Sequence, residues 1–156
     1  MKKFASLKFA GLALLGSFAL AACNQANLTG TAKTYAFAAQ AQPLYTVQAG
    51  TATRADLSSK DTSTVLVATG LKASTDYVAH YHAQGDATKA PCASGGAIVD
   101  GMIGGMTFTS DASGNLTIKG LDTTTALATA KYINIHEAAA LAIVPLCADL
   151  TLPPTK

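Results

Sequence analysis

Short runs of alternating apolar and polar side chains follow one another from residue 35 onward, and turn residues separate them. A period of two is typical of strands with one buried face. The predicted strands cover residues 35–40, 44–50, 63–69, 77–83, 106–110, 115–120, 131–137 and 146–152. Residues 85–105 are glycine-rich and irregular, and 123–130 could form a short helix or a connection. This spacing predicts an all-β domain over residues 34–156, a sandwich or barrel with little helix.

The first 22 residues have a different pattern. Lys2, Lys3 and Lys8 make a basic start, residues 9–20 are apolar, and small residues precede Cys23. This order is typical of a signal peptide, and the run L-A-A-C resembles the lipobox at which bacterial lipoproteins are cleaved and lipidated. We therefore expect a signal peptide over 1–22, a lipidated Cys23 and a flexible tether over 23–33. The alternative is an ordinary signal peptide followed by an unrelated cysteine.

Removal of the signal peptide changes the charge of the chain. The formal net charge of +2 includes three lysines of that segment, so the mature chain has slightly more acidic than basic residues. No basic patch remains that would favour a nucleic acid as partner, and no later apolar run is long enough to span a bilayer. The expected location is the cell envelope or periplasm, with the membrane contacted through the lipid anchor.

Histidine is rare and confined to two predicted strands. The chain has three histidines, His80 and His82 in one strand and His136 in another. Residues i and i+2 of a strand share a face, so the first two imidazoles lie side by side. If His136 lies on a neighbouring strand, the three rings can form a site with an open position, which suits copper or zinc. The alternative is that these histidines only fill the surface or the core.

Two cysteines remain when Cys23 is assigned to the lipid. An even pair in an exported domain favours a disulfide between Cys92 and Cys147, because the compartment is oxidising. Two thiols that help to bind a metal are the alternative.

Several motifs occur in the order seen in the copper/zinc superoxide dismutases. They are Gly70-Leu71, His80-x-His82 with Gly85-Asp86, Cys92-x-Ser94-x-Gly96, a hairpin over 106–120 with Gly114 at its turn, Ile135-His136-Glu137, and Cys147. Over residues 44–152 the chain therefore resembles this family. The resemblance implies a Greek-key β-sandwich or barrel, a Cys92–Cys147 disulfide, and copper held by His80, His82 and His136. It also implies that these histidines are catalytic and that superoxide is the substrate.

The zinc half of the family's site is missing. Where the family has a histidine that bridges copper and zinc, this chain has Ile98, and Gly101 and Gly104 lie near the last of the zinc-ligand positions. With no other histidine, the family's zinc site cannot be built, and the chain resembles the copper-only branch. We expect copper and no zinc.

Other differences concern catalysis. Val144 occupies the position of the arginine that orients superoxide in the family, and Ala140 that of an aspartate behind the copper ligands. The connection from His136 to Cys147 is also short, so guidance of the anion should be weak. Glu137 points away from His136 in a regular strand and is expected to be a solvated charge.

Two alternatives to an enzyme remain. Met102 and Met106 lie in the segment that replaces the zinc loop, and thioethers are soft ligands that suit Cu(I), so the protein could carry copper without turnover. The runs A-H-x-H at 79–82 and Y-x-N-x-H at 132–136 also resemble chordin-type (CHRD) domains, which implies a metal-free structural module.

Overall fold

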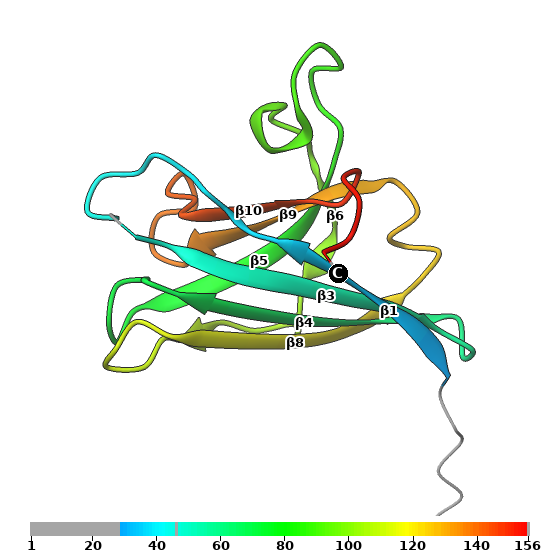
Figure 1. Ribbon diagram of the computed structural model, residues 1–156, viewed down its shortest axis with the longest axis horizontal. Coiled ribbons are helices and arrows are strands. Elements are labelled where there is room, and N and C mark those ends of the chain that lie inside the picture. Colours follow the sequence, from blue (N-terminus) through cyan, green and yellow to red (C-terminus); the bar gives the residue numbers. More distant parts are fainter. Residues whose placement is uncertain (1–28, 46, 156) are drawn as a thin grey trace, which may run out of the picture.

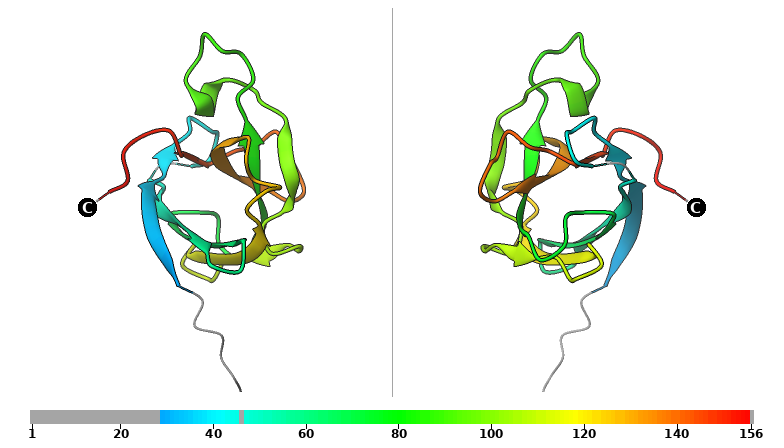
Figure 2. Two further views of the ribbon diagram at one scale, coloured as in Figure 1. Left: turned by 90° about the vertical axis from the view of Figure 1, so that its right-hand side faces the viewer. Right: turned by 90° about the vertical axis from the view of Figure 1, so that its left-hand side faces the viewer.

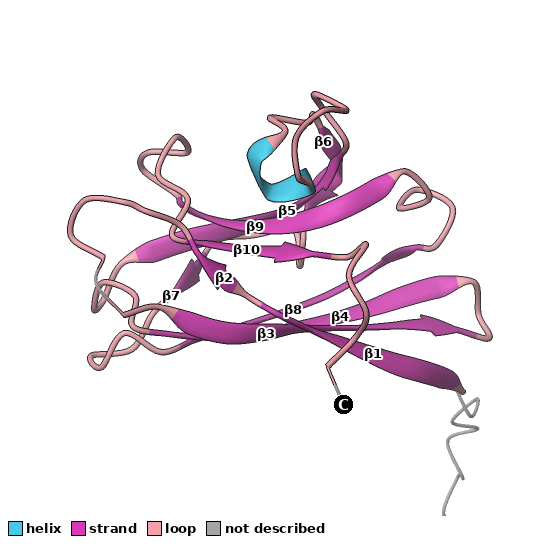
Figure 3. Ribbon diagram, turned by 45° about the horizontal axis from the view of Figure 1, so that its top comes forward, coloured by secondary structure: helices cyan, strands magenta, loops and turns pink. Residues whose placement is uncertain are grey.

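The computed structural model describes residues 29–45 and 47–155, and nearly all regular structure in them is β (Figure 3). The strands are β1 (Gly30–Ala36), β2 (Ala38–Ala39), β3 (Ala49–Leu57), β4 (Asp61–Thr69), β5 (Asp76–Ala83), β6 (Ile98–Met102), β7 (Phe108–Thr109), β8 (Leu116–Thr123), β9 (Ala130–Glu137) and β10 (Leu146–Asp149). A single 3-10 turn, η1 (Pro91–Ala93), is the helical part of the described chain. The predicted all-β class is confirmed.

The strands form two antiparallel sheets that face each other (Figure 1). One sheet has the order β1-β3-β4-β8, and the other has the order β2-β10-β9-β5-β6, with β7 also paired to β5. The chain leaves the first sheet after β4 and returns to it as β8, which pairs with β4. This crossover is of the Greek-key kind. The end-on views of Figure 2 show the strands of the two layers on opposite sides of the domain.

The core lies between the two sheets and is formed by the side chains that each strand points inward. Leu66 and Ile118 come from the first sheet, and Tyr81, Ile133 and Ile135 from the second, all at most 1% exposed. Burying each of these side chains contributes roughly 1.5–3 kcal/mol to folding. The alternation of apolar and polar residues in these strands therefore correctly predicted which side chains face the core.

β5 and β9 are buried on both faces, unlike the other long strands. Their outer faces lie under two connections, residues 84–97, called here the covering loop, and residues 138–145, the β9–β10 loop. The covering loop projects above the second sheet at the top of Figures 1 and 2. A disulfide between Cys92 and Cys147, with Cα atoms 5.9 Å apart, joins it to β10 and confirms the predicted pair.

A close backbone contact also fixes the end of the covering loop. A Cβ atom at Gly96 would lie 1.7 Å from the carbonyl oxygen of Ala83, so only glycine fits there. Ala83 in turn donates its N–H to the carbonyl of Ala97 at 2.9 Å. The loop is thus tied at one end to β5 and near its middle to β10.

The structure differs from the sequence prediction at several elements. β1 begins at Gly30, inside the expected tether, because residues 30–36 pair with β3. The strand expected over 44–50 overlaps β3 (Ala49–Leu57) only at Ala49 and Gly50, so most of that prediction is wrong. Polar residues of β3 obscured its alternation, because the inward-facing Arg54 lies over the ring of the buried Tyr81, 5.9 Å from its centroid. β6 lies inside the stretch expected to be irregular. Over 123–130, where a short helix or a connection was expected, residues 124–129 form turns, which is the second of these possibilities.

The predicted signal peptide, the lipidated Cys23 and residues 24–28 of the tether lie outside the described residues. Among the residues that the structure does describe, no helix is long and apolar enough to cross a membrane.

Candidate metal centre

The three histidines meet on the outer face of the second sheet. His80 and His82 point outward from β5, and His136 points outward from β9, because their inward neighbours form the core. One nitrogen from each ring lies within 4.8 Å of the others. The side chains are only 6%, 6% and 7% exposed. The sequence-based grouping of these residues is therefore confirmed as a buried three-histidine group that could hold a metal ion.

Two backbone carbonyls determine which nitrogens face the centre. His82 Nδ1 lies 2.9 Å from the carbonyl oxygen of Gly96, and His136 Nδ1 lies 2.6 Å from that of Leu141. A carbonyl only accepts, so each Nδ1 must carry the proton, and each Nε2 then has a free lone pair. The covering loop and the β9–β10 loop thus prepare two imidazoles as ligands.

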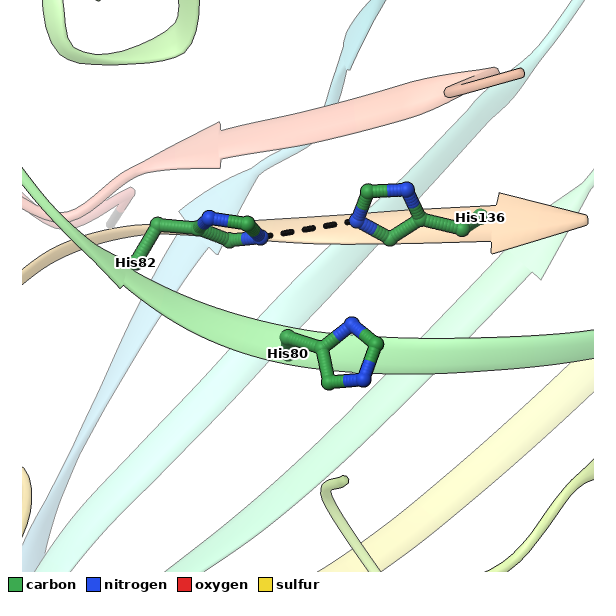
Figure 4. A group of neighbouring side chains, drawn as sticks. All are labelled: His80, His82 and His136. Carbon is green, nitrogen blue, oxygen red and sulfur yellow. Dashed lines mark hydrogen bonds between the residues drawn. The ribbon is translucent and has the colours of Figure 1, made fainter. Parts of the chain in front are cut away.

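The two Nε2 atoms lie 3.4 Å apart (Figure 4). With both Nδ1 atoms protonated, neither Nε2 of a neutral ring can donate to the other, and the two lone pairs repel. A cation between them removes the repulsion. Bonds of about 2.0–2.1 Å to a shared ion would give an N–metal–N angle of roughly 110–115°, which suits a tetrahedral or trigonal centre.

His80 supplies the third nitrogen. Its Nδ1 is buried and has no hydrogen-bond partner. Figure 4 shows one nitrogen of its ring turned toward the gap between His82 and His136. The donor set therefore fits a borderline metal ion, and the identity of that ion is a matter of proposal.

The electrostatics favour neutral rings, as a metal ligand requires. Burial, reinforced by the neighbouring histidines, lowers the pKa of His80 to about 4. Burial also lowers the pKa of His82 and of His136, although the bonds to the carbonyls of Gly96 and Leu141 oppose the shift. At neutral pH few protons compete with a metal for these nitrogens.

Tyr132 holds His82 in place, a contact that the sequence analysis did not identify. The two rings are stacked, with centroids 4.8 Å apart and planes 8° apart. The Tyr132 hydroxyl accepts a hydrogen bond from the N–H of Gly96 at 2.9 Å, next to the carbonyl that binds His82. The alternation Tyr132-x-Asn134-x-His136 could have revealed this shared outer face.

Of the residues of the 98–106 segment named in the sequence analysis, Ile98 and Met102 lie on the strand next to the histidines of β5 and Met106 does not. Ile98 pairs with His82 across β5 and β6 and is 50% exposed, and Met102 pairs with His80 and is 37% exposed. Met106 is 58% exposed and lies beyond the end of β6. A hollow of about 700 Å³ lies beside Met102 toward β8, but no histidine lines it.

Glu137 does point away from His136, but the expectation of a solvated charge is wrong. The residue is only 9% exposed and faces the inner side of the barrel. Its Oε1 accepts hydrogen bonds from the hydroxyl of Tyr45, at 2.6 Å, and from the ammonium of Lys72. Strand alternation gave its direction correctly, but it could not show that Lys72 and Tyr45 lie there.

No family model matches the chain, and no curated protein matches it. The fold and the site define a β-sandwich protein with a buried three-histidine group able to hold a metal ion.

Proposed function

We propose that this chain is an exported, lipid-anchored copper protein, similar to the copper-only branch of the copper/zinc superoxide dismutases, and that it dismutes superoxide. The observation that supports this most is the facing pair of Nε2 lone pairs of His82 and His136, 3.4 Å apart, with the unpartnered Nδ1 of His80 beside them. Three imidazoles of this kind suit both oxidation states of copper.

The chain's own residues prepare the site and limit its flexibility. The carbonyls of Gly96 and Leu141 orient two rings, Tyr132 stacks on one of them, and the Cys92–Cys147 disulfide holds the covering loop in place. Copper, when bound, would alternate between Cu(II) and Cu(I), so that two superoxide anions and two protons become oxygen and hydrogen peroxide.

Turnover should be slower than the resemblance to the family alone would suggest. Ile98 places an apolar, half-exposed side chain across from His82, where a bridging imidazole would otherwise lie. Val144 carries no charge to attract superoxide, and Lys72 is already paired with Glu137. Without focused positive potential, an anion loses roughly 10- to 1,000-fold in encounter rate.

The experiment is the decay rate of superoxide with the full chain in detergent, loaded with one equivalent of copper and freed of loose metal. The matched control combines His136→Ala with Thr117→His, which keeps three histidines but places one on the exposed outer side of β8. We expect decay above that of the metal-free chain, and loss of this excess in the control variant. Equal rates in the two copper-loaded proteins would contradict the proposal.

A copper-carrying protein without turnover is the second candidate, and the register of β6 favours it. Met102 pairs with His80, although the ladder is irregular between His80 and Tyr81, so a methionine lies on the strand next to the group. This function predicts that Met102→Leu weakens Cu(I) binding while Met106→Leu, at an exposed position outside β6, does not. Bound copper without superoxide decay would select this candidate, and absence of bound copper would favour a metal-free module of the CHRD type.

A further inference from the structure

Asn134 lies in the middle of the histidine face. Strand pairing places four residues in one row across the second sheet, namely Met102, His80, Asn134 and Cys147. His82 pairs with Tyr132 on one side of this row, and His136 pairs with Val78 on the other. Because the rings of His82 and His136 approach each other to 3.4 Å, they meet above the row that contains His80 and Asn134.

The side chain of Asn134 is buried without a partner for its oxygen. The residue is 8% exposed, and its Oδ1 makes no hydrogen bond. Over residues 29–45 and 47–155, the buried side-chain atoms without a partner are this oxygen, His80 Nδ1 and Asp122 Oδ2. Two of the three thus belong to residues paired directly across β5 and β9. Unpartnered buried amides are uncommon and costly, and they call for an explanation.

These two atoms do not satisfy each other. Strand pairing places the two residues directly opposite each other, yet neither His80 Nδ1 nor Asn134 Oδ1 has a hydrogen-bond partner. If the proton of His80 is on Nε2, both atoms are acceptors and cannot bond. The Nε2 atoms of His82 and His136 are acceptors as well, because their Nδ1 atoms donate to carbonyls. His80 Nδ1, Asn134 Oδ1 and these two Nε2 atoms thus belong to one buried face, and none of the four accepts a hydrogen bond from a donor of the described chain. Unsatisfied acceptors on a buried face suit a cation.

We propose that Asn134 Oδ1 is a fourth protein ligand of the metal, so that the site offers three imidazole nitrogens and one amide oxygen. This inference rests on the three-histidine metal site of the proposed function, but it needs neither copper nor superoxide. An amide oxygen is a harder donor than imidazole or a thioether. Asn134 therefore favours Cu(II) and Zn(II) over Cu(I), and opposes any preference that Met102 gives to Cu(I).

The test compares the full chain with Asn134→Val and Asn134→Asp. Valine has a similar volume and suits a strand but has no oxygen, and aspartate retains an oxygen donor. Affinities for Cu(II), Zn(II) and Cu(I) are measured by competition with chelators, and the electron paramagnetic resonance spectrum of Cu(II) reports the donor set. We expect Asn134→Val to lose about tenfold or more in Cu(II) and Zn(II) affinity, with an altered Cu(II) spectrum and little change for Cu(I). Asn134→Asp should retain divalent binding.

Thermal unfolding of the metal-free proteins separates a ligand from a structural amide. If Asn134 only supports the fold, Asn134→Val lowers the unfolding temperature without metal. If it is a ligand, the metal-free variant unfolds at the same or a higher temperature, because an unpartnered buried oxygen is gone, and gains less from added Zn(II).

The outcomes distinguish the two proposals. Unchanged divalent affinity and an unchanged Cu(II) spectrum in Asn134→Val would overturn the ligand role while leaving copper binding intact. Zn(II) binding that depends on Asn134, without superoxide decay by the copper-loaded chain, would support this inference and contradict the proposed dismutase. A wild-type chain that binds none of these ions overturns both.

Discussion

Two neighbouring residues of β9, His136 and Glu137, face opposite sides of one sheet and belong to two very different polar clusters. On the inner side Glu137 joins Lys72, Tyr45 and Tyr77 at one end of the barrel. The N–H of Lys72 donates to the Tyr77 hydroxyl at 3.0 Å, the Tyr77 and Tyr45 hydroxyls are 2.7 Å apart, and Tyr45 donates to Glu137. Every donor in this series has an acceptor.

The outer cluster contains acceptors that no donor of the described chain satisfies, among them His80 Nδ1 and Asn134 Oδ1. The Nε2 atoms of His82 and His136 face each other, and the Nδ1 atoms of these two rings donate to loop carbonyls. Both clusters are buried, so burial alone does not distinguish them. What distinguishes the two clusters is whether their donors and acceptors are hydrogen-bonded. A polar cluster that satisfies itself stabilises the fold, whereas one that is prepared and left unsatisfied is suited to a ligand.

The largest effect should come from removal of the disulfide, because it supports the outer face and the fold together. The bridge closes a chain separation of 55 residues, so Cys92→Ser with Cys147→Ser should cost about 4 kcal/mol of unfolding free energy on the chain-entropy model. The covering loop also carries the carbonyl that orients His82, so metal affinity should fall as well. Urea unfolding and metal competition measure the two losses. A loss of stability without a loss of metal affinity would show that the covering loop orients His82 without help from the disulfide.

A change in the inner cluster should cost stability and leave the metal site alone. Glu137→Gln removes the charge that Lys72 faces, and we expect a loss of about 2 kcal/mol, since the ion pair is partly buried. Lys72→Met is the matched variant that removes the other partner. Both should bind Cu(II) within threefold of the wild type. A large fall in Cu(II) affinity would contradict the separation of the two faces.

The acid response should be the most gradual effect, and metal should alter it. The pKa values of all three histidines are lowered in the folded chain, mainly by burial. The folded protein then binds fewer protons than the unfolded one, so stability is greatest above the unfolded pKa near 6.5 and declines as the pH falls through the folded values. For His80 the decline extends to about pH 4.

The measurement is the unfolding temperature of the metal-free chain from pH 7.5 to 4. The lowered pKa of Glu137 also makes the folded chain less stable in acid, but only below the ordinary pKa of 4.5 for this carboxyl group. We therefore assign the loss of stability between pH 6.5 and 5 to the histidines. Bound metal should move the decline to lower pH, because protons must displace it. A flat profile over this range in the metal-free chain would contradict the neutral buried rings.

The sequence alone was enough to predict the class of fold and the core of the site. Alternation placed His80 and His82 together, and the expectation of an oxidising compartment paired Cys92 with Cys147. Both depend on strand periodicity and residue chemistry, which are local or compositional properties. The class of fold followed in the same way, from regular spacing of short alternating runs.

What could not be predicted depends on contacts between distant segments. Asn134 looked like one polar residue among others, because its unpartnered oxygen only emerges once β5 and β9 are in register. Glu137 looked solvated because Tyr45 lies 92 residues earlier in the chain. Arg54 hid the second half of β3, since a charge near Tyr81 inside the barrel breaks the usual alternation. Residue propensities and hydrophobic patterns do not show which distant residues come into contact in the fold.

Direct observation of the ligands of a bound ion tests best whether the outer face of β5 and β9 is a metal centre. We would load the full chain with one equivalent of Cu(II), remove loose metal, and record the electron paramagnetic resonance spectrum of the wild type and of His82→Ala. We expect stoichiometric copper with nitrogen couplings from imidazoles in the wild type, and either no retained copper or fewer imidazole couplings in the variant. Copper that washes away, or an identical spectrum in both proteins, would contradict it.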